Sequence, residues 1–179
     1  LTSLNYFFNS ISSKVYKAEK IDTHGGSLRI YISKNKKVKI HNSVKDILKE
    51  EDKFGVKNFQ TYKNFEKKIL QIKRNVRKNL KKLLNNHNEI IGYGSPAKAT
   101  TALNFFGISK EIKCIIEDNK LKHGKFIPGV KIPIISKKKL KTNPKCILVL
   151  AWNFFNEIKK ENQDLSKNFI SISDLKKLS

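Results

Sequence analysis

The chain has 179 residues, which suits one domain with part of another, and it carries a formal net charge of +23. Only three of its 38 basic residues are arginine, the group best suited to bases and phosphates. Lysine, asparagine and isoleucine all have A/T-rich codons, so we expect no nucleic-acid partner. No apolar run reaches the roughly 18 residues of a membrane span and no signal-peptide pattern is present, which predicts a cytoplasmic protein without a membrane partner.

The first 40 residues predict the C-terminal end of a truncated domain. Residues 1–11 are apolar at helical spacing, and residues 15–21 and 28–32 predict two strands joined by a glycine-rich turn. Because an isolated hairpin is marginally stable in water, we expect a larger sheet whose other strands lie outside this chain. His24, in the turn, could face a substrate or simply cap the turn.

Residues 41–87 predict a helical connector. Ser43 and Asp46 resemble a capping box at the start of a short helix, which Gly55 ends. From Phe59 onward the apolar residues recur every three or four positions, which predicts a helix of about 28 residues. Its lysine-rich face could hold an anionic partner, but a solvated face enriched by the lysine bias is the simpler interpretation.

From residue 88 the pattern alternates between strands and helices. We predict strands at 89–92, 112–117, 146–150 and 169–172, and helices at 96–106, 136–140 and 153–165. The Pro- and Gly-rich residues 123–134 predict a loop that closes over one end of the sheet. Continuous apolar strands are typical of parallel sheets covered on both faces, so the expected fold class is α/β, a Rossmann-like, mainly parallel sheet with flanking helices. Cys114 and Cys146 lie in apolar runs without C-x-x-C spacing, which predicts buried thiols and no metal site.

A glycine turn follows the first of these strands. Ser95 is the predicted N-cap of the next helix and Pro96 its first residue. The run matches G-x-G-x-x-G/A, a pattern that directs helix N–H groups at a phosphate, although a bare strand-to-helix turn explains it equally well. Lys98 could add a positive charge. The run comprises Gly92, Tyr93, Gly94, Ser95, Pro96, Ala97 and Lys98.

Two further strand ends carry polar residues. Asp118 follows the second strand, 24 residues after Gly94, near the usual offset of an acidic group that binds a ribose. Asn153 follows the third strand, where it is placed to cap a helix. Because ligands of parallel sheets bind beyond the carboxyl ends of the strands, these three ends favour a site for a nucleotide or a nucleotide-sugar.

Together these motifs resemble the C-terminal domain of S-adenosylmethionine-dependent C-methyltransferases, whose best-known members methylate a carbon of a nucleotide-linked deoxyhexose. The resemblance covers nearly the whole chain, including the turn at 24–29 and the long helix. Ser95 and Ala99 depart from the family pattern, where Ala and Gly are usual. The matching segments of the last domain are 92–98, 104–108, 117–119, 122, 124–125, 128–133 and 152–153.

The resemblance implies a nucleotide-sugar substrate whose nucleotide or diphosphate binds this domain, and it leaves a catalytic role for His24 open. It also implies that S-adenosylmethionine, the catalytic base and a zinc-binding domain belong upstream of Leu1. The absence of methionine fits a fragment, which we expect to be inactive alone. A non-catalytic nucleotide-binding Rossmann-like module is the alternative. The implied substrate-binding residues are Gly92, Tyr93, Gly94, Ser95, Ala97, Lys98, Asp118 and Asn153.

Overall fold

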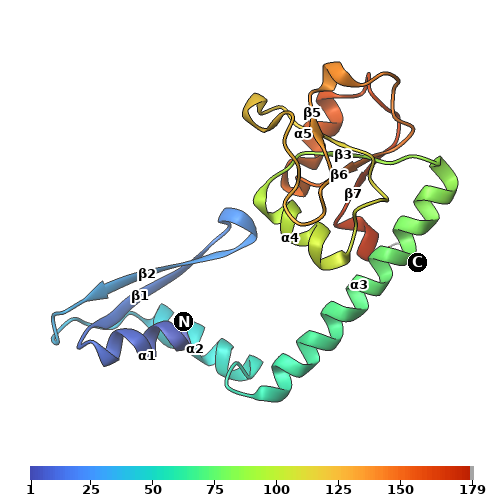
Figure 1. The fold of residues 1–179 in the computed structure, drawn as a ribbon. Helices are drawn as coiled ribbons and strands as arrows, with labels where there is room; N and C mark the ends of the chain where they lie inside the picture. The colour runs from blue at the N-terminus through green and yellow to red at the C-terminus, as the bar shows by residue number, and fades with distance from the viewer. Residues whose placement is uncertain (178–179) are drawn as a thin grey trace. The chain divides into compact units, whose positions relative to one another are not determined.

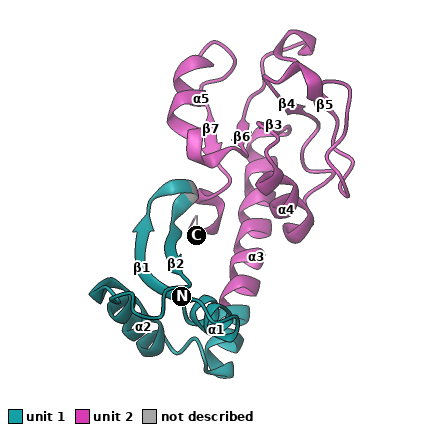
Figure 2. Cartoon of the chain, turned by 90° about the vertical axis from the view of Figure 1, so that its left-hand side faces the viewer, with its two compact units in different colours: residues 1–67 teal, residues 68–179 magenta. Residues whose placement is uncertain are grey.

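The computed structural model describes residues 1–177, except for the side chain of His24. The chain forms two compact units, residues 1–67 and 68–179 (Figures 1 and 2). Among the described residues no helix is long and apolar enough to cross a membrane.

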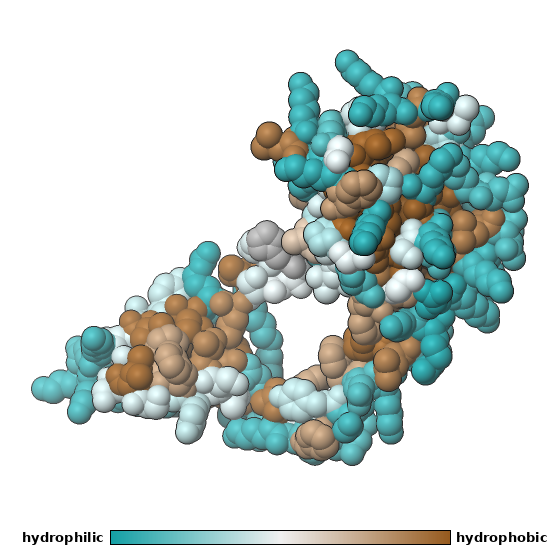
Figure 3. Space-filling model, viewed as in Figure 1, coloured by the Kyte–Doolittle hydropathy of each residue, from teal (hydrophilic) through white to brown (hydrophobic). Residues whose placement is uncertain are grey.

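The first unit contains the predicted hairpin. β1 and β2 pair antiparallel, from Lys14 opposite Ser33 to Ile21 opposite Ser27. The helix α2 packs on one face of this hairpin, where Val44 belongs to the same buried cluster as the strand residues. Apolar side chains also gather on the exposed surface of this unit (Figure 3). The elements are α1 (Thr2–Ser10), β1 (Lys14–Ile21), the 3-10 turn η1 (Thr23–Gly25), β2 (Ser27–Ser33) and α2 (Asn42–Phe54).

The start of α2 differs from the prediction. The N-cap is His41, whose Nδ1 accepts a hydrogen bond from the backbone N–H of Ser43 at 3.1 Å. The predicted cap at Ser43 is therefore wrong, because the helix begins at Asn42 and Ser43 already lies in its first turn. Gly55 ends the helix in the left-handed conformation with φ of +80°, as predicted.

The long helix α3 (Phe59–His87) has 29 residues, close to the predicted length. Its second half is more than a connector. Val76, Leu80 and Leu83 are buried in the core of the second unit, so the boundary between the two units falls inside the helix.

The second unit is built on a parallel five-stranded sheet in the order β5-β4-β3-β6-β7. This confirms the predicted α/β, Rossmann-like fold. The strand β5 is a correction, because it pairs with β4 where we predicted only a loop and a helix. Its two residues are too few to show a periodicity. The strands are β3 (Ile91–Tyr93), β4 (Ile115–Ile116), β5 (Ile134–Ile135), β6 (Ile147–Val149) and β7 (Phe169–Ser171).

Helices cover both faces of this sheet. On one face, α3 and α4 (Ala97–Phe106) pack with Leu148 and its neighbours, and on the other α5 (Phe155–Glu161) packs near Val149. Neighbouring residues of a strand therefore enter different clusters, which explains the continuous apolar runs. The helix predicted at 153–165 is shorter, because the turn η4 (Trp152–Phe154) precedes it and it ends at Glu161. The remaining turns are η2 (Lys120–Lys122), η3 (Lys137–Lys139) and η5 (Asp174–Lys176).

Candidate functional site

The two glycines of the β3–α4 turn are needed for packing. A Cβ atom on Gly92 would lie 2.8 Å from Cγ1 of Ile115. Gly94 has φ of +82°, and a Cβ atom there would lie 2.7 Å from the Cβ of Ala151. Both distances are shorter than real Cβ contacts, so the neighbouring strands, rather than a ligand, require these glycines.

Ser95 does not cap α4, which is a second correction at this turn. Pro96 is the N-cap, and the backbone N–H of Ser95 donates to Oε2 of Glu117 at 2.8 Å. The Ser95 hydroxyl donates to the same oxygen. The N–H of Gly94 donates to the carbonyl of Ile116 at 2.8 Å. The N–H groups of Gly94 and Ser95 are thus used inside the protein, and the carboxylate of Glu117 is the anion that Ser95 binds.

Glu117 is held as an anion by its surroundings. Its Oε1 accepts the N–H of Asn119 at 3.1 Å, and Nζ of Lys122 lies 3.3 Å from Oε2. Burial acts to raise the pKa of Glu117, but the hydrogen bonds from Ser95 and Asn119 and the charge of Lys122 together lower it below its ordinary value. A carboxylate with a lowered pKa is a weak base, so Glu117 serves as a fixed charge.

Asp118 is exposed at the end of β4 and is oriented by Tyr93. The buried phenol donates to both carboxylate oxygens, at 2.9 and 3.0 Å. Burial, reinforced by the hydrogen bond and charge of Asp118, raises the pKa of Tyr93, so the phenol remains a donor at neutral pH. The lone pairs of Asp118 that Tyr93 does not use can accept hydrogen bonds from a ligand.

These groups surround a pocket of 330 Å³ at the carboxyl edge of the sheet, which we call the acidic pocket. Four of the chain's 15 acidic residues line it, against one of its 38 basic residues. Such a wall repels phosphate and suits hydroxyl donors. Among the described residues, no three His, Cys, Asp or Glu side chains gather as a metal-binding group. The lining is Tyr93, Gly94, Ser95, Pro96, Glu117, Asp118, Lys122, Ala151, Phe154, Glu157, Ile158 and Glu161.

The structure brings together only some of the predicted site residues. Tyr93, Gly94, Ser95 and Asp118 line the acidic pocket, whereas Gly92 is enclosed in the sheet. The predicted residues outside that lining are Ala97, Lys98 and Asn153.

Lys98 and Asn153 are placed at the same edge of the sheet but act differently from the prediction. Nζ of Lys98 lies 4.4 Å from the ring centroid of Trp152, a cation–π contact. Asn153 is exposed within η4, and the N-cap of α5 is Phe154, without a side-chain cap. The predicted cap at Asn153 is therefore wrong, because an unpredicted 3-10 turn delays the start of the helix. The side chain of His24 lies outside the described residues.

Sequence reasoning did not count three carboxylates of the acidic pocket among the site residues, although Glu117 belongs to the matching segment 117–119. Glu117 directly precedes Asp118, at the end of an apolar strand. Glu157 and Glu161 are four residues apart on α5, a spacing that places two side chains on one face of a helix. This spacing, on the helix that follows the third predicted strand, was the sequence signal from which Glu157 and Glu161 could have been predicted.

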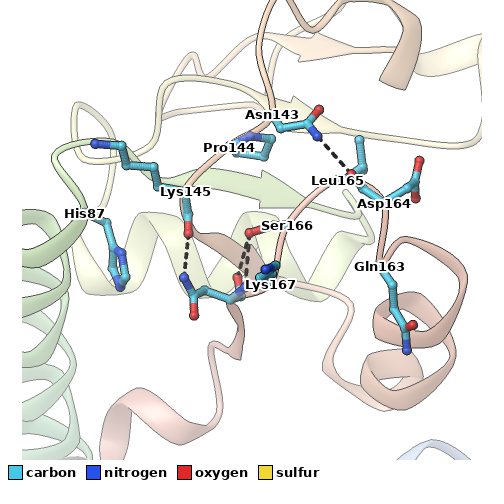
Figure 4. A pocket seen from close by; sticks show the side chains of 10 residues that line it. His87, Asn143, Pro144, Lys145, Gln163, Asp164, Leu165, Ser166 and Lys167 are labelled. Carbon is cyan, nitrogen blue, oxygen red and sulfur yellow. Dashed lines mark hydrogen bonds between the residues drawn. The ribbon is translucent and has the colours of Figure 1, made fainter.

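A second pocket of 430 Å³ lies at the opposite edge of the sheet, before β6 and β7 (Figure 4). Two side-chain amides hold its loops together. Asn143 Nδ2 donates to the carbonyl of Asp164 at 2.9 Å (Figure 4). Asn168 Nδ2 donates to the carbonyl of Lys145 at 3.0 Å. Because ligands of parallel sheets bind at the carboxyl ends of the strands, we assign this cleft a structural role.

Comparisons with known proteins place the chain in a family. The model of the C-methyltransferase C-terminal domain matches residues 22–171. The chain is also 28% identical over 171 residues to the C-methyltransferase NovU of Streptomyces niveus, covering 94% of this chain and 41% of that protein. It thus spans less than half the length of this curated relative. Since the family model covers most of the chain, the protein belongs to the C-methyltransferase C-terminal domain family.

Proposed function

We propose that this chain is the C-terminal part of an S-adenosylmethionine-dependent enzyme that methylates a carbon of a nucleotide-linked sugar, and that it binds the substrate. Family membership supports the reaction class. The observation that carries the binding role is the acidic pocket, in which Asp118 is exposed to a ligand while Tyr93 fixes its carboxylate. Oriented carboxylates are suitable acceptors for the hydroxyls of a ribose or a hexose.

The diphosphate belongs elsewhere in this proposal. Glu117 already occupies the N–H and hydroxyl of Ser95, and the pocket beyond it is lined by carboxylates. The start of α4 is a better location, because Ala97 is exposed and the ammonium of Lys98 is held beside Trp152. A helix N-terminus and a lysine both favour an anion.

S-adenosylmethionine would supply the methyl group, and we place its site and the catalytic base in the rest of the methyltransferase. Two groups of the acidic pocket are poor bases, because the pKa of Glu117 is lowered and the phenol of Tyr93, whose pKa is raised, keeps its proton. The zinc-binding domain of the resemblance belongs to the same remaining part of the protein.

The first unit supports this placement of the catalytic machinery. α1 buries no residue fully, and two of its aromatic side chains remain on the surface, with Tyr6 79% and Phe7 54% exposed. A methyltransferase domain that packs on α1 and extends the β1–β2 sheet would cover them.

The test measures uridine diphosphate-glucose and uridine diphosphate binding to the 179-residue chain, with methyl transfer from labelled S-adenosylmethionine followed in parallel. We expect weak binding of the nucleotide-sugar and no methyl transfer. Asp118→Asn should weaken nucleotide-sugar binding by about tenfold, as for a hydrogen bond to a charged group, while the exposed Asp46→Asn leaves it unchanged.

Either half of the proposal can fail separately. Methyl transfer by the isolated chain would refute the placement of the cofactor and the base. Equal affinity of wild type and Asp118→Asn would refute the substrate-binding role of the acidic pocket. Binding by this chain without methylation by the full-length protein would favour a non-catalytic nucleotide-binding module.

A further inference from the structure

A second pocket at the carboxyl edge of the sheet has no role in the function described so far. It has a volume of 250 Å³ and lies on the face that α3 and α4 cover. Its lining is mostly apolar, with one hydroxyl and one ammonium group. We call it the Trp152 pocket, and it is lined by Ile72, Val76, Ala102, Phe106, Trp152, Ile172, Ser173 and Lys176.

The walls of this pocket are fixed by contacts within the second unit. The ammonium of Lys98 lies over the Trp152 ring. On the other side, Asn79 Nδ2 donates to the carbonyl of Leu175 at 2.7 Å and Asn75 Nδ2 to the carbonyl of Lys176 at 3.4 Å, so α3 holds the turn η5 in place. The pocket is therefore preformed, which lowers the entropic cost of binding a rigid ring.

The Trp152 pocket and the acidic pocket share one turn. Trp152 lines the first, whereas its neighbours Ala151 and Phe154 line the second. Ligand pockets usually measure roughly 300 to 1,000 Å³; the Trp152 pocket, at 250 Å³, lies below this range and the acidic pocket, at 330 Å³, at its lower end, so neither suits a whole nucleotide-sugar by itself. A ligand with chemically different parts would suit the pair.

The charges around the two pockets favour different parts of such a ligand. The Trp152 pocket offers two aromatic rings with the ammonium groups of Lys98 and Lys176 beside them, and the acidic pocket offers carboxylates. Aromatic side chains stack on any nucleobase, because every base has a π-face. Neighbouring ammonium groups complement the phosphates that a base carries through its ribose.

We propose that the Trp152 pocket binds the planar base of a nucleotide, with the phosphates toward Lys98. This inference rests on the proposed function to the extent that the nucleotide is the one that carries the sugar.

Trp152 is the chain's one tryptophan, so its fluorescence reports on this pocket directly. The full chain is titrated with uridine diphosphate and adenosine diphosphate, and with ribose 5-phosphate as a ligand that lacks a base. We expect saturable quenching by at least one of the two nucleotides and none by ribose 5-phosphate.

Two variants in the pocket and one matched control complete the test. Ala102→Leu fills the pocket and should weaken nucleotide binding by at least about tenfold, and Phe106→Leu, which keeps an apolar side chain but loses the ring, should weaken it by about fivefold or more. Thr101→Leu adds similar bulk on the exposed side of the same helix and should bind as wild type. Far-ultraviolet circular dichroism and thermal unfolding verify that each variant is folded.

The inference is overturned if ribose 5-phosphate quenches Trp152 as strongly as the nucleotides do, if neither nucleotide quenches it, or if folded Ala102→Leu binds like Thr101→Leu. These outcomes differ from failure of the proposed function. If Trp152 responds to nucleotides while Asp118→Asn leaves nucleotide-sugar binding unchanged, the base site stands and the sugar site fails.

Discussion

The two pockets at the carboxyl edge of the sheet differ in chemistry although they share the turn after β6. The acidic pocket is lined by carboxylates, two of which other protein groups orient: Tyr93 donates to Asp118, and Ser95 donates to Glu117. The Trp152 pocket is built from rings and aliphatic side chains on the helical face. The glycine turn of β3 supports this edge without offering its own N–H groups, so the side chains beyond it, rather than the motif, decide what each pocket binds.

Substitution of Gly94 should disturb this shared edge more than any other single change. In Gly94→Ala, the added methyl lies 2.7 Å from the Cβ of Ala151, and φ of +82° is unfavourable for alanine. Strain and overpacking together predict a loss of about 2–5 kcal/mol in the free energy of unfolding, measured in urea. Both pockets should lose ligand affinity, because Ala151 belongs to the turn they share.

Gly124 provides the matched control for Gly94. It has φ of +76°, but an added Cβ would meet nothing within 4 Å. Gly124→Ala should therefore lower the free energy of unfolding only by the cost of placing alanine in the left-handed backbone conformation, about 1–2 kcal/mol. Equal destabilisation by the two variants would contradict the packing role assigned to Gly94.

Glu117→Leu should alter the acidic pocket and leave nucleotide binding in the Trp152 pocket unchanged. The substitution leaves the N–H groups of Ser95 and Asn119 without their carboxylate, which predicts a loss of about 1–3 kcal/mol in stability. Glu161→Gln, at an exposed carboxylate of the same pocket, should change the stability by less than about 0.5 kcal/mol. Quenching of Trp152 by a nucleotide should survive in folded Glu117→Leu, and loss of that quenching would contradict the independence of the pockets.

Acidification should remove the stability that the carboxylate of Glu117 contributes to the folded chain. Because the pKa of Glu117 is lower in the folded chain, the stability this carboxylate contributes is present above its unfolded value near 4.5 and is lost as the pH falls through the folded value. Urea unfolding from neutral pH downward measures this loss. Glu117→Gln should show a shallower decline below about pH 4.5, and a decline as steep as that of wild type would contradict the contribution assigned to Glu117.

The sequence predicted the elements of this fold that are marked by a regular pattern of apolar residues. Apolar residues every three or four positions predicted α3, and continuous runs such as the one in β6 predicted a covered parallel sheet. The two-residue strand β5 was missed because it is defined only by its partner β4.

The candidate site was predictable only in part, as the fold was. The expectation that Asp118 lies near the glycine turn followed from strand order, and the two do line one pocket. The partner of Ser95 did not follow, because Glu117 is 22 positions away and only the folded sheet brings its carboxylate to the turn. The roles of Gly92 and Gly94 likewise depend on side chains that only the fold brings beside them, Ile115 of β4 and Ala151 of the turn after β6. Local patterns identify turns, whereas tertiary partners decide which of their groups remain available to a ligand.

The smallest expected effect concerns Lys98, which lies on the Trp152 side of the shared edge. Lys98→Gln removes a charge near the proposed phosphate position, worth about 0.5–1 kcal/mol of phosphate binding at an accessible site. Uridine diphosphate should therefore bind roughly two- to fivefold more weakly, while uridine, which has the base and no phosphate, binds as before. Lys125→Gln, at an exposed lysine outside the lining of both pockets, is the matched control. If Lys98→Gln weakened the binding of uridine and of uridine diphosphate equally, Lys98 would act by positioning Trp152 rather than by attracting phosphate. The proposed division between a pocket that binds the base and a lysine that binds the phosphates would then be wrong.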